Sequence, residues 1–68
     1  SARCDSVTVD NSATNLCAVS GKTIFEGDTC EVTCQDGFAT QAGERSKVLR
    51  CEASGFNAVP SLGSMSCQ

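Results

Sequence analysis

Cysteine is the residue type that most constrains the chemistry of this chain. Six cysteines occur among 68 residues, and a Cys content above about 8 % marks a disulfide scaffold in a short secreted chain. The other chemistry open to cysteine is zinc binding, which normally uses close Cys pairs that are often completed by His. The chain has no His, and its one close pair, Cys30 and Cys34, has three residues between its members. We therefore predict disulfides, with no metal ion and no cofactor. The six are Cys4, Cys17, Cys30, Cys34, Cys51 and Cys67.

Side chains that could catalyse a reaction are sparse. Nucleophilic catalysis needs a base beside the nucleophile, and no His is present to serve as one. Carboxylates such as Glu26 and Asp28 act as acid and base only inside a pocket that shifts their pKa values, and a chain this short rarely encloses one. The sequence around them also lacks the repeated Asp residues of a Ca²⁺ loop. We interpret this acidic pair as a solvated turn and predict that the chain is not an enzyme.

The composition limits both the core and the kinds of partner. A chain of 68 residues forms one domain and buries only about 60 % of the surface that its unfolded form exposes. It has no Trp, no Tyr and three Phe, so covalent cross-links must supplement the apolar core. The net charge is −3, whereas nucleic-acid binding needs a basic face. No apolar run is long enough to span a membrane. We expect neither nucleic-acid binding nor membrane insertion.

Short alternating segments separated by turn residues predict an all-β chain. The alternation is strictest between Thr29 and Cys34, where Cys30, Val32 and Cys34 share one face and Glu31 points to the other. Gly37 and its neighbours form a turn signal directly after this strand. Residues 11–15 are polar and are interpreted as a loop. Strands are predicted at residues 5–9, 22–25, 29–34, 38–40 and 47–51.

Four of the cysteines have the spacing of a sushi (complement control protein) module. They are arranged as Cys4-x29-Cys34-x16-Cys51-x15-Cys67. Gly37-Phe38 follows Cys34 where the family has Cys-x-x-Gly-Tyr/Phe, and Gly55-Phe56 falls where the family has Gly-x-Trp. Gly27 and Gly43 also match family positions. The chain resembles a divergent sushi module over nearly its whole length.

Several departures from the sushi pattern concern the core. Phe56 is the nearest substitute for the missing Trp, Val32 replaces an aromatic residue before Cys34, and the Pro beside the last cysteine is absent. Cys17 and Cys30 have no place in the four-cysteine module. A third disulfide would compensate for the smaller core, since such a cross-link typically stabilises by ~2–4 kcal/mol.

The resemblance implies a compact, elongated, disulfide-rich all-β module spanning residues 1–68, excised from a longer multi-module secreted or cell-surface protein. The family's first-to-third and second-to-fourth pattern implies the disulfides Cys4–Cys51 and Cys34–Cys67, which leaves Cys17–Cys30. The resemblance also implies an extracellular recognition or adhesion role toward a protein partner, a neighbouring module or a glycan.

Two other functional classes stay open. One is a purely structural spacer between modules. The other is a Kazal-type serine protease inhibitor, because the segment from Cys17 to Phe25 resembles the Cys-Gly-Ser-Asp-Gly-Lys-Thr-Tyr of that family. However, only one cysteine lies upstream of Cys17, and the inhibitor's helix would have to fall on the alternating residues 29–34.

Two groups of residues are candidates for partner binding. The loop between Cys17 and Cys30 presents Lys22, Ile24 and Phe25; the last two are adjacent, so an extended strand points them to opposite faces. A thin module buries one of them well. The other is then either an anchor for a partner or covered by a neighbouring loop. The second group is a basic cluster. Two of its members, Arg45 and Lys47, are expected to share a strand face. The cluster is either a contact for an acidic partner or a set of charges that keeps a sheet edge from pairing. It consists of Arg45, Lys47 and Arg50.

The cysteine assignment makes a prediction about folding. Full reduction should unfold the chain at 37 °C, because removing the disulfides of a small secreted domain often abolishes folding at that temperature. A chelator should leave the thermal midpoint unchanged. Circular dichroism melts measure both effects, and loss of structure on adding chelator alone would restore the metal interpretation.

Overall fold

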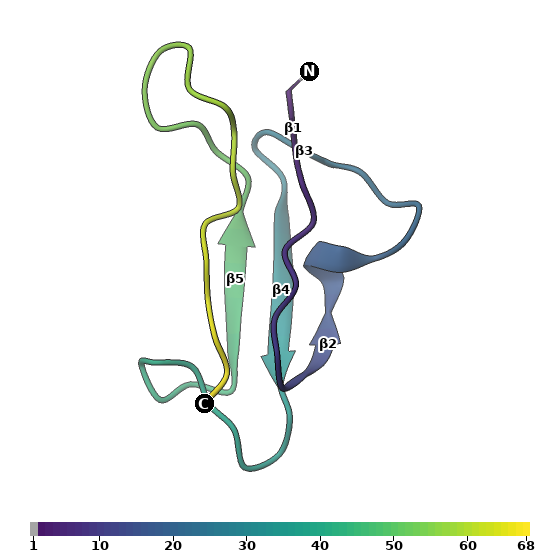
Figure 1. The fold of residues 1–68 in the computed structure, drawn as a ribbon, viewed down its shortest axis with the longest axis vertical. Coiled ribbons are helices and arrows are strands. Elements are labelled where there is room, and N and C mark those ends of the chain that lie inside the picture. The colour runs from purple at the N-terminus through teal and green to yellow at the C-terminus, as the bar shows by residue number, and fades with distance from the viewer. Residues whose placement is uncertain (1) are drawn as a thin grey trace.

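The strand β4 lies at the centre of the structure. In the computed structural model, which describes residues 2–68, β4 pairs antiparallel with β2 on one side and with β5 on the other. A second, two-stranded sheet joins β1 to β3. Figure 1 shows the larger sheet running along the long axis of a molecule that measures 39 × 26 × 14 Å. The elements, in chain order, are β1 (Arg3–Cys4), β2 (Ser12–Asn15), the single 3-10 turn η1 (Leu16–Ala18), β3 (Ile24–Phe25), β4 (Thr29–Cys34) and β5 (Ser46–Arg50).

The two faces of β4 have the composition that the alternation predicts. Cys30, Val32 and Cys34 are buried, whereas Glu31 is exposed. Its bounds are those expected from the sequence. The turn after it is closed by a hydrogen bond from the Phe38 N–H to the Gln35 carbonyl (3.0 Å), and Gly37 within this turn has a φ of 86°, a conformation that glycine adopts without steric cost.

The strand predicted at residues 5–9 is absent, and the predicted loop at residues 11–15 contains β2 instead. Val9 is buried as the alternation requires, but the backbone of this segment has other partners. The carbonyl of Val7 accepts from the Asn15 side chain (2.8 Å), and the Val7 N–H donates to the Cys17 carbonyl (3.4 Å). The polar residues of β2 instead meet the open edge of β4, and tertiary context overrides their low strand propensity.

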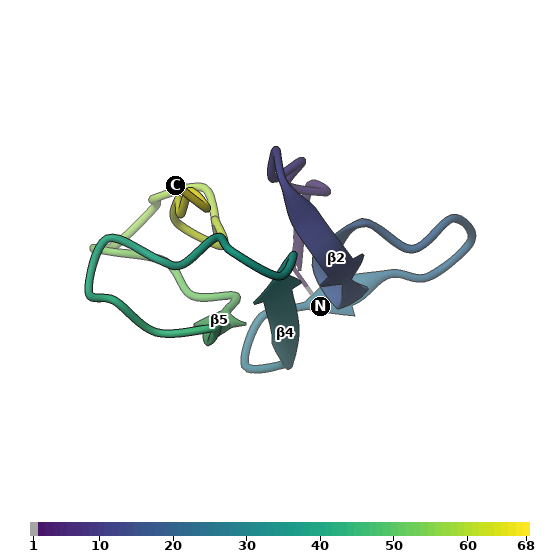
Figure 2. The same cartoon turned by 90° about the horizontal axis from the view of Figure 1, so that it is seen from below.

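The other predicted strands are shortened or displaced. The segment 22–25 is a strand only at β3, and 47–51 is displaced by one residue to β5. Residues 38–40 form no strand; Ala39 instead exchanges two backbone hydrogen bonds with Gln68 (2.9 and 2.8 Å). Long loops therefore lie between the strands. Figure 2 shows residues 35–45 as a wide loop on the β5 side and the loop near residue 20 extending beyond β2.

Six of the eleven buried core residues are cysteines. They form three disulfides, Cys4–Cys51, Cys17–Cys30 and Cys34–Cys67, which are the pairs that the sushi resemblance implies. The remaining core residues are aliphatic: Val9, Ile24, Val32, Leu49 and Leu62. The fold is thus a small, disulfide-rich, all-β structure whose core consists of three disulfides and five branched aliphatic side chains.

The two faces of β5 predict different mutational costs for adjacent residues. Leu49 is buried and Val48 is 58 % exposed. We expect Leu49→Ala to lower the free energy of unfolding by about 2–5 kcal/mol and Val48→Ala to change it by less than about 0.5 kcal/mol. Denaturant titration with the disulfides intact measures both. Equal costs would contradict the assigned register of β5.

Candidate functional site

The loop between Cys17 and Cys30, here called the stapled loop, is attached to the core at both ends. Its two cysteines are buried and their Cα atoms lie 5.3 Å apart across the disulfide. The Asn15 side chain accepts a hydrogen bond from the Cys17 N–H (2.9 Å), which caps η1. Toward the other end of the loop, β3 pairs with β1, in which Cys4 is bonded to Cys51. Disulfides and strand pairing together hold the loop to the sheet.

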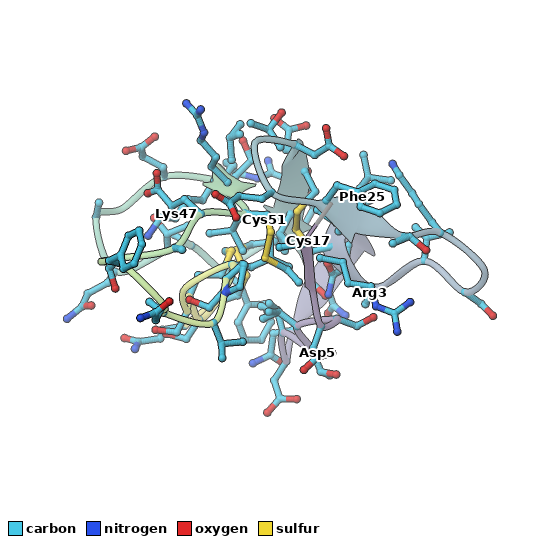
Figure 3. All side chains as sticks on the ribbon, turned by 90° about the horizontal axis from the view of Figure 1, so that it is seen from above. Arg3, Asp5, Cys17, Phe25, Lys47 and Cys51 are labelled. Carbon is cyan, nitrogen blue, oxygen red and sulfur yellow. A yellow bond between two sulfur atoms is a disulfide. The ribbon has the colours of Figure 1, made fainter. Side chains whose placement is uncertain are left out.

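Ile24 and Phe25 divide between core and surface, as their adjacency predicts. Ile24 is 6 % exposed, whereas Phe25 is 43 % exposed. Across the β1–β3 ladder Phe25 faces Arg3, and Figure 3 shows Phe25 on the side of the molecule that lies away from Lys47. The stapled loop therefore presents a large aromatic side chain whose neighbour in sequence is anchored in the core.

The turn after Phe25 is closed by an aspartate. The Asp28 carboxylate accepts from the Phe25 N–H (3.1 Å), the Asp28 N–H donates to the Phe25 carbonyl (2.9 Å), and the Glu26 N–H donates to the Ala2 carbonyl (2.8 Å). The acidic pair thus belongs to a solvent-exposed turn, as interpreted from the sequence. Within residues 2–68, no three His, Cys, Asp or Glu side chains are grouped so that they would hold a metal ion.

Further exposed side chains belong to the same part of the chain. Leu16 and Val19 are each about two-fifths exposed (42 %), and Lys22 is exposed in a turn closed by its N–H to the Val19 carbonyl (3.2 Å). The surface of the stapled loop therefore combines apolar side chains with one cation and the two carboxylates of the turn, and Arg3 of β1 adds a second cation next to Phe25.

The three basic residues have different surroundings. Arg45 lies just before β5, and its guanidinium bonds the Asp36 carboxylate at 2.6 Å, with both side chains mostly exposed. β5 begins at Ser46, so the expectation that Arg45 and Lys47 share a strand face stays a prediction. Lys47 and Arg50 are three residues apart in β5, and period-two alternation puts them on opposite faces.

Phe56 does not lie in the core, although the sushi pattern has its Trp at this position. It is 97 % exposed, so it does not fill the core position of the family's Trp. The neighbouring Asn57 has a φ of 69° and Gly55 a φ of 109°, which place the aromatic residue in a turn. Val59 is 85 % exposed in the same loop. Turn-forming residues on both sides of Phe56 are the sequence signal that points to this exposure.

A hollow lies beside the start of β5. It has a volume of about 660 Å³ and is lined by residues of three segments, 40–44, 46–47 and 64–66. Glu44 and Lys47 supply its charges and Met65 its apolar surface; the other lining residues are mainly hydroxyl-bearing and small. Such a lining suits hydrogen bonding to an extended polar chain.

Comparisons with protein-family models, with curated proteins and with solved structures found no match to this chain. The fold and its surface define the chain as a small, disulfide-rich all-β protein. No helix among residues 2–68 has the length and apolar character needed to cross a membrane.

The split between Ile24 and Phe25 predicts two different phenotypes. Ile24→Ser should destabilise the fold by several kcal/mol, because it removes a buried apolar side chain and buries a hydroxyl; each effect costs about 1–3 kcal/mol. Phe25→Ala should leave the fold intact. The dispersion of ¹⁵N–¹H spectra and thermal melts separate the two, and unfolding of both variants would place Phe25 in the core instead.

Proposed function

We propose that this chain is a non-catalytic extracellular recognition module that binds a protein partner through the stapled loop. The observation that carries the proposal is Phe25, a half-exposed aromatic side chain on a loop attached to the core at both ends. Aromatic residues dominate the binding energy of protein interfaces. A loop that is already ordered loses little further conformational entropy when it binds.

The charges around Phe25 indicate the chemistry of the partner surface. Arg3 lies opposite Phe25 in the β1–β3 ladder, and Lys22 lies three residues before it. The carboxylates of Glu26 and Asp28 follow Phe25 in the exposed turn, so the charges around the ring are of both signs. A partner that offers an apolar pocket with charges of both signs at its rim complements this arrangement, because rim charges of opposite sign raise the association rate. A sulfated glycan is the second partner class that such cations attract.

The sushi resemblance supports an extracellular role. The disulfides Cys4–Cys51 and Cys34–Cys67 follow the family's pairing, and three disulfides in a small domain are compatible with an oxidising, extracellular location. Figure 1 shows β1 and the C-terminal residue near opposite ends of the long axis, an arrangement that suits modules joined in tandem. The exposed Phe56 is a departure from the family's core.

The alternatives would depend on other parts of the structure. A spacer would use the exposed loop around Phe56 and Val59 to contact a neighbouring module. A Kazal-type inhibitor would need a helix at residues 29–34, where the chain has β4. We therefore favour recognition through the stapled loop over inhibition.

Binding to arrayed extracellular proteins tests the proposal, with wild type, Phe25→Ala and Phe56→Ala compared at equal folded concentration. We expect a partner whose affinity falls at least about tenfold in Phe25→Ala, which corresponds to the truncation of a binding anchor. Phe56→Ala is the matched control, because it removes the same side chain from a different loop, and it should bind normally.

The other outcomes separate the functional classes. Loss of binding in Phe56→Ala alone would assign the contact to the spacer surface. Stoichiometric inhibition of a serine protease by wild type would restore the inhibitor.

A further inference from the structure

The strand β5 has an open edge, and this edge is regular. β5 pairs only with β4 in the described part of the chain. Its register, from Thr29↔Arg50 to Thr33↔Ser46, runs without a shift, whereas the β2–β4 ladder is interrupted between Ser12 and Thr14. β5 also contains no proline. Two of the devices that usually blunt an edge strand, a bulge and a proline, are thus missing from it.

The hydrogen bonds at both ends of β5 identify which residues face the open edge. The Arg45 carbonyl accepts from the Cys34 N–H (2.7 Å), and the Cys51 N–H donates to the Asp28 carbonyl (2.9 Å). Odd-numbered residues therefore direct their backbone groups toward β4. Because these groups alternate in direction along an antiparallel strand, the N–H and C=O groups of the even-numbered residues point outward. These residues are Ser46, Val48 and Arg50.

One residue pair already occupies the continuation of this edge. Glu52 and Ser61 exchange two backbone hydrogen bonds (3.1 and 3.0 Å) in an antiparallel bridge. Leu62 then turns into the core, and Cys67 is bonded to Cys34 of β4. The chain thus begins to add a strand to this edge and leaves it after one residue.

Hollows lie between β5 and the departing segment. The cleft of about 660 Å³ is lined by Ser46 and Lys47 on the β5 side and by residues 64–66 on the other. A smaller hollow of about 190 Å³ lies at the other end, between Arg50 and residues 61–63. The space beside the edge is therefore open at both ends of β5.

The side chains of β5 select the charge of a strand that would pair with it. Lys47 and Arg50 are both exposed, the strand has no acidic residue, and neither cation makes an ion pair within residues 2–68. Pairing of β5 with a second copy of itself would place four cations on two adjacent strands, and like charges on paired strands are destabilising. The same cations attract an acidic strand.

We propose that the open edge of β5 binds an extended acidic segment of a partner protein by strand addition. The segment runs antiparallel to β5, in the direction that Ser61 already takes. It places acidic residues opposite Arg50 and Lys47 and a β-branched residue opposite Val48, which gives the pattern acidic-x-branched-acidic. Backbone hydrogen bonds supply affinity and the alternating side chains supply specificity. This surface does not involve the stapled loop; Figure 3 shows Lys47 and Phe25 on opposite sides of the molecule.

The peptide Ac-ETVET-NH₂, which stops short of the position that Ser61 occupies opposite Glu52, is the probe, titrated into the ¹⁵N-labelled protein. Its two glutamates lie opposite Arg50 and Lys47, and its valine lies opposite Val48. We expect saturable shifts of the amide resonances of Ser46, Val48 and Arg50 that weaken as salt is added. No saturation at about 1 mM peptide overturns the proposal. Concentration-dependent shifts of the same amides without peptide make a second copy the occupant and also overturn it.

Two N-methylated peptides test the backbone contacts. Methylation of the valine nitrogen should abolish binding, because that N–H donates to the Val48 carbonyl in the proposed register. Methylation of the nitrogen of the threonine before the valine should preserve binding, because that N–H points away from β5. Equal effects of the two methyl groups overturn strand addition.

Charge variants test the side-chain contacts. The double variant Lys47→Glu/Arg50→Glu should bind the acidic peptide at least about tenfold more weakly and should bind Ac-KTVKT-NH₂ instead. The matched control Ser6→Glu/Thr8→Glu/Ala13→Glu/Thr14→Glu makes the same change in net charge at exposed positions outside both β5 and the stapled loop, and it should bind the peptide like wild type. Glu44→Gln should strengthen binding, because Glu44 lines the cleft beside Lys47. If the double variant and its control weaken binding equally, only the net charge matters and the edge site is wrong.

Discussion

The inner face of β4 is the constraint on which the rest of the structure depends. Cys30 and Cys34 lie on this face, four residues apart, with the fully buried Val32 between them. Two cysteines on one strand face cannot bond to each other across an extended chain, so each takes a distant partner. Cys17 attaches the stapled loop and Cys67 attaches the C-terminal segment. One strand therefore holds segments from both halves of the chain.

The thickness of the molecule explains why so many apolar side chains reach the surface. Its shortest extent is 14 Å, little more than the ~10 Å that separates two stacked sheets. Each strand can bury one face only, so Ile24 and Leu49 are buried while the residues next to them in sequence are exposed. Phe25 and Val48 are exposed for this reason. The third disulfide supplements the core that such a thin body lacks, since it restricts the unfolded chain rather than adding buried surface.

The two proposed surfaces derive their rigidity from the same strand but differ in chemistry. The stapled loop lies on the β2 side of the sheet and offers side chains, above all Phe25. The open edge of β5 lies on the other side and offers backbone groups, with Lys47 and Arg50 as the charges that select among partners. A module bearing both can engage a folded partner and an extended one at the same time.

The sequence by itself determined those features that depend on local pattern. Strict alternation determined β4, and the adjacency of Ile24 and Phe25 determined that they point to opposite faces, one of which is exposed. The family resemblance, rather than any local pattern, supplied the disulfide pairing. Only the tertiary structure decided which backbone groups pair. Residues 12–15 form a strand because the edge of β4 is available to pair with them. Residues 5–9 do not, and the Val7 carbonyl accepts a hydrogen bond from the Asn15 side chain instead. The open edge of β5 likewise depends on where the chain turns after Ser61, since hydrogen bonding between distant segments leaves no periodic trace in either one.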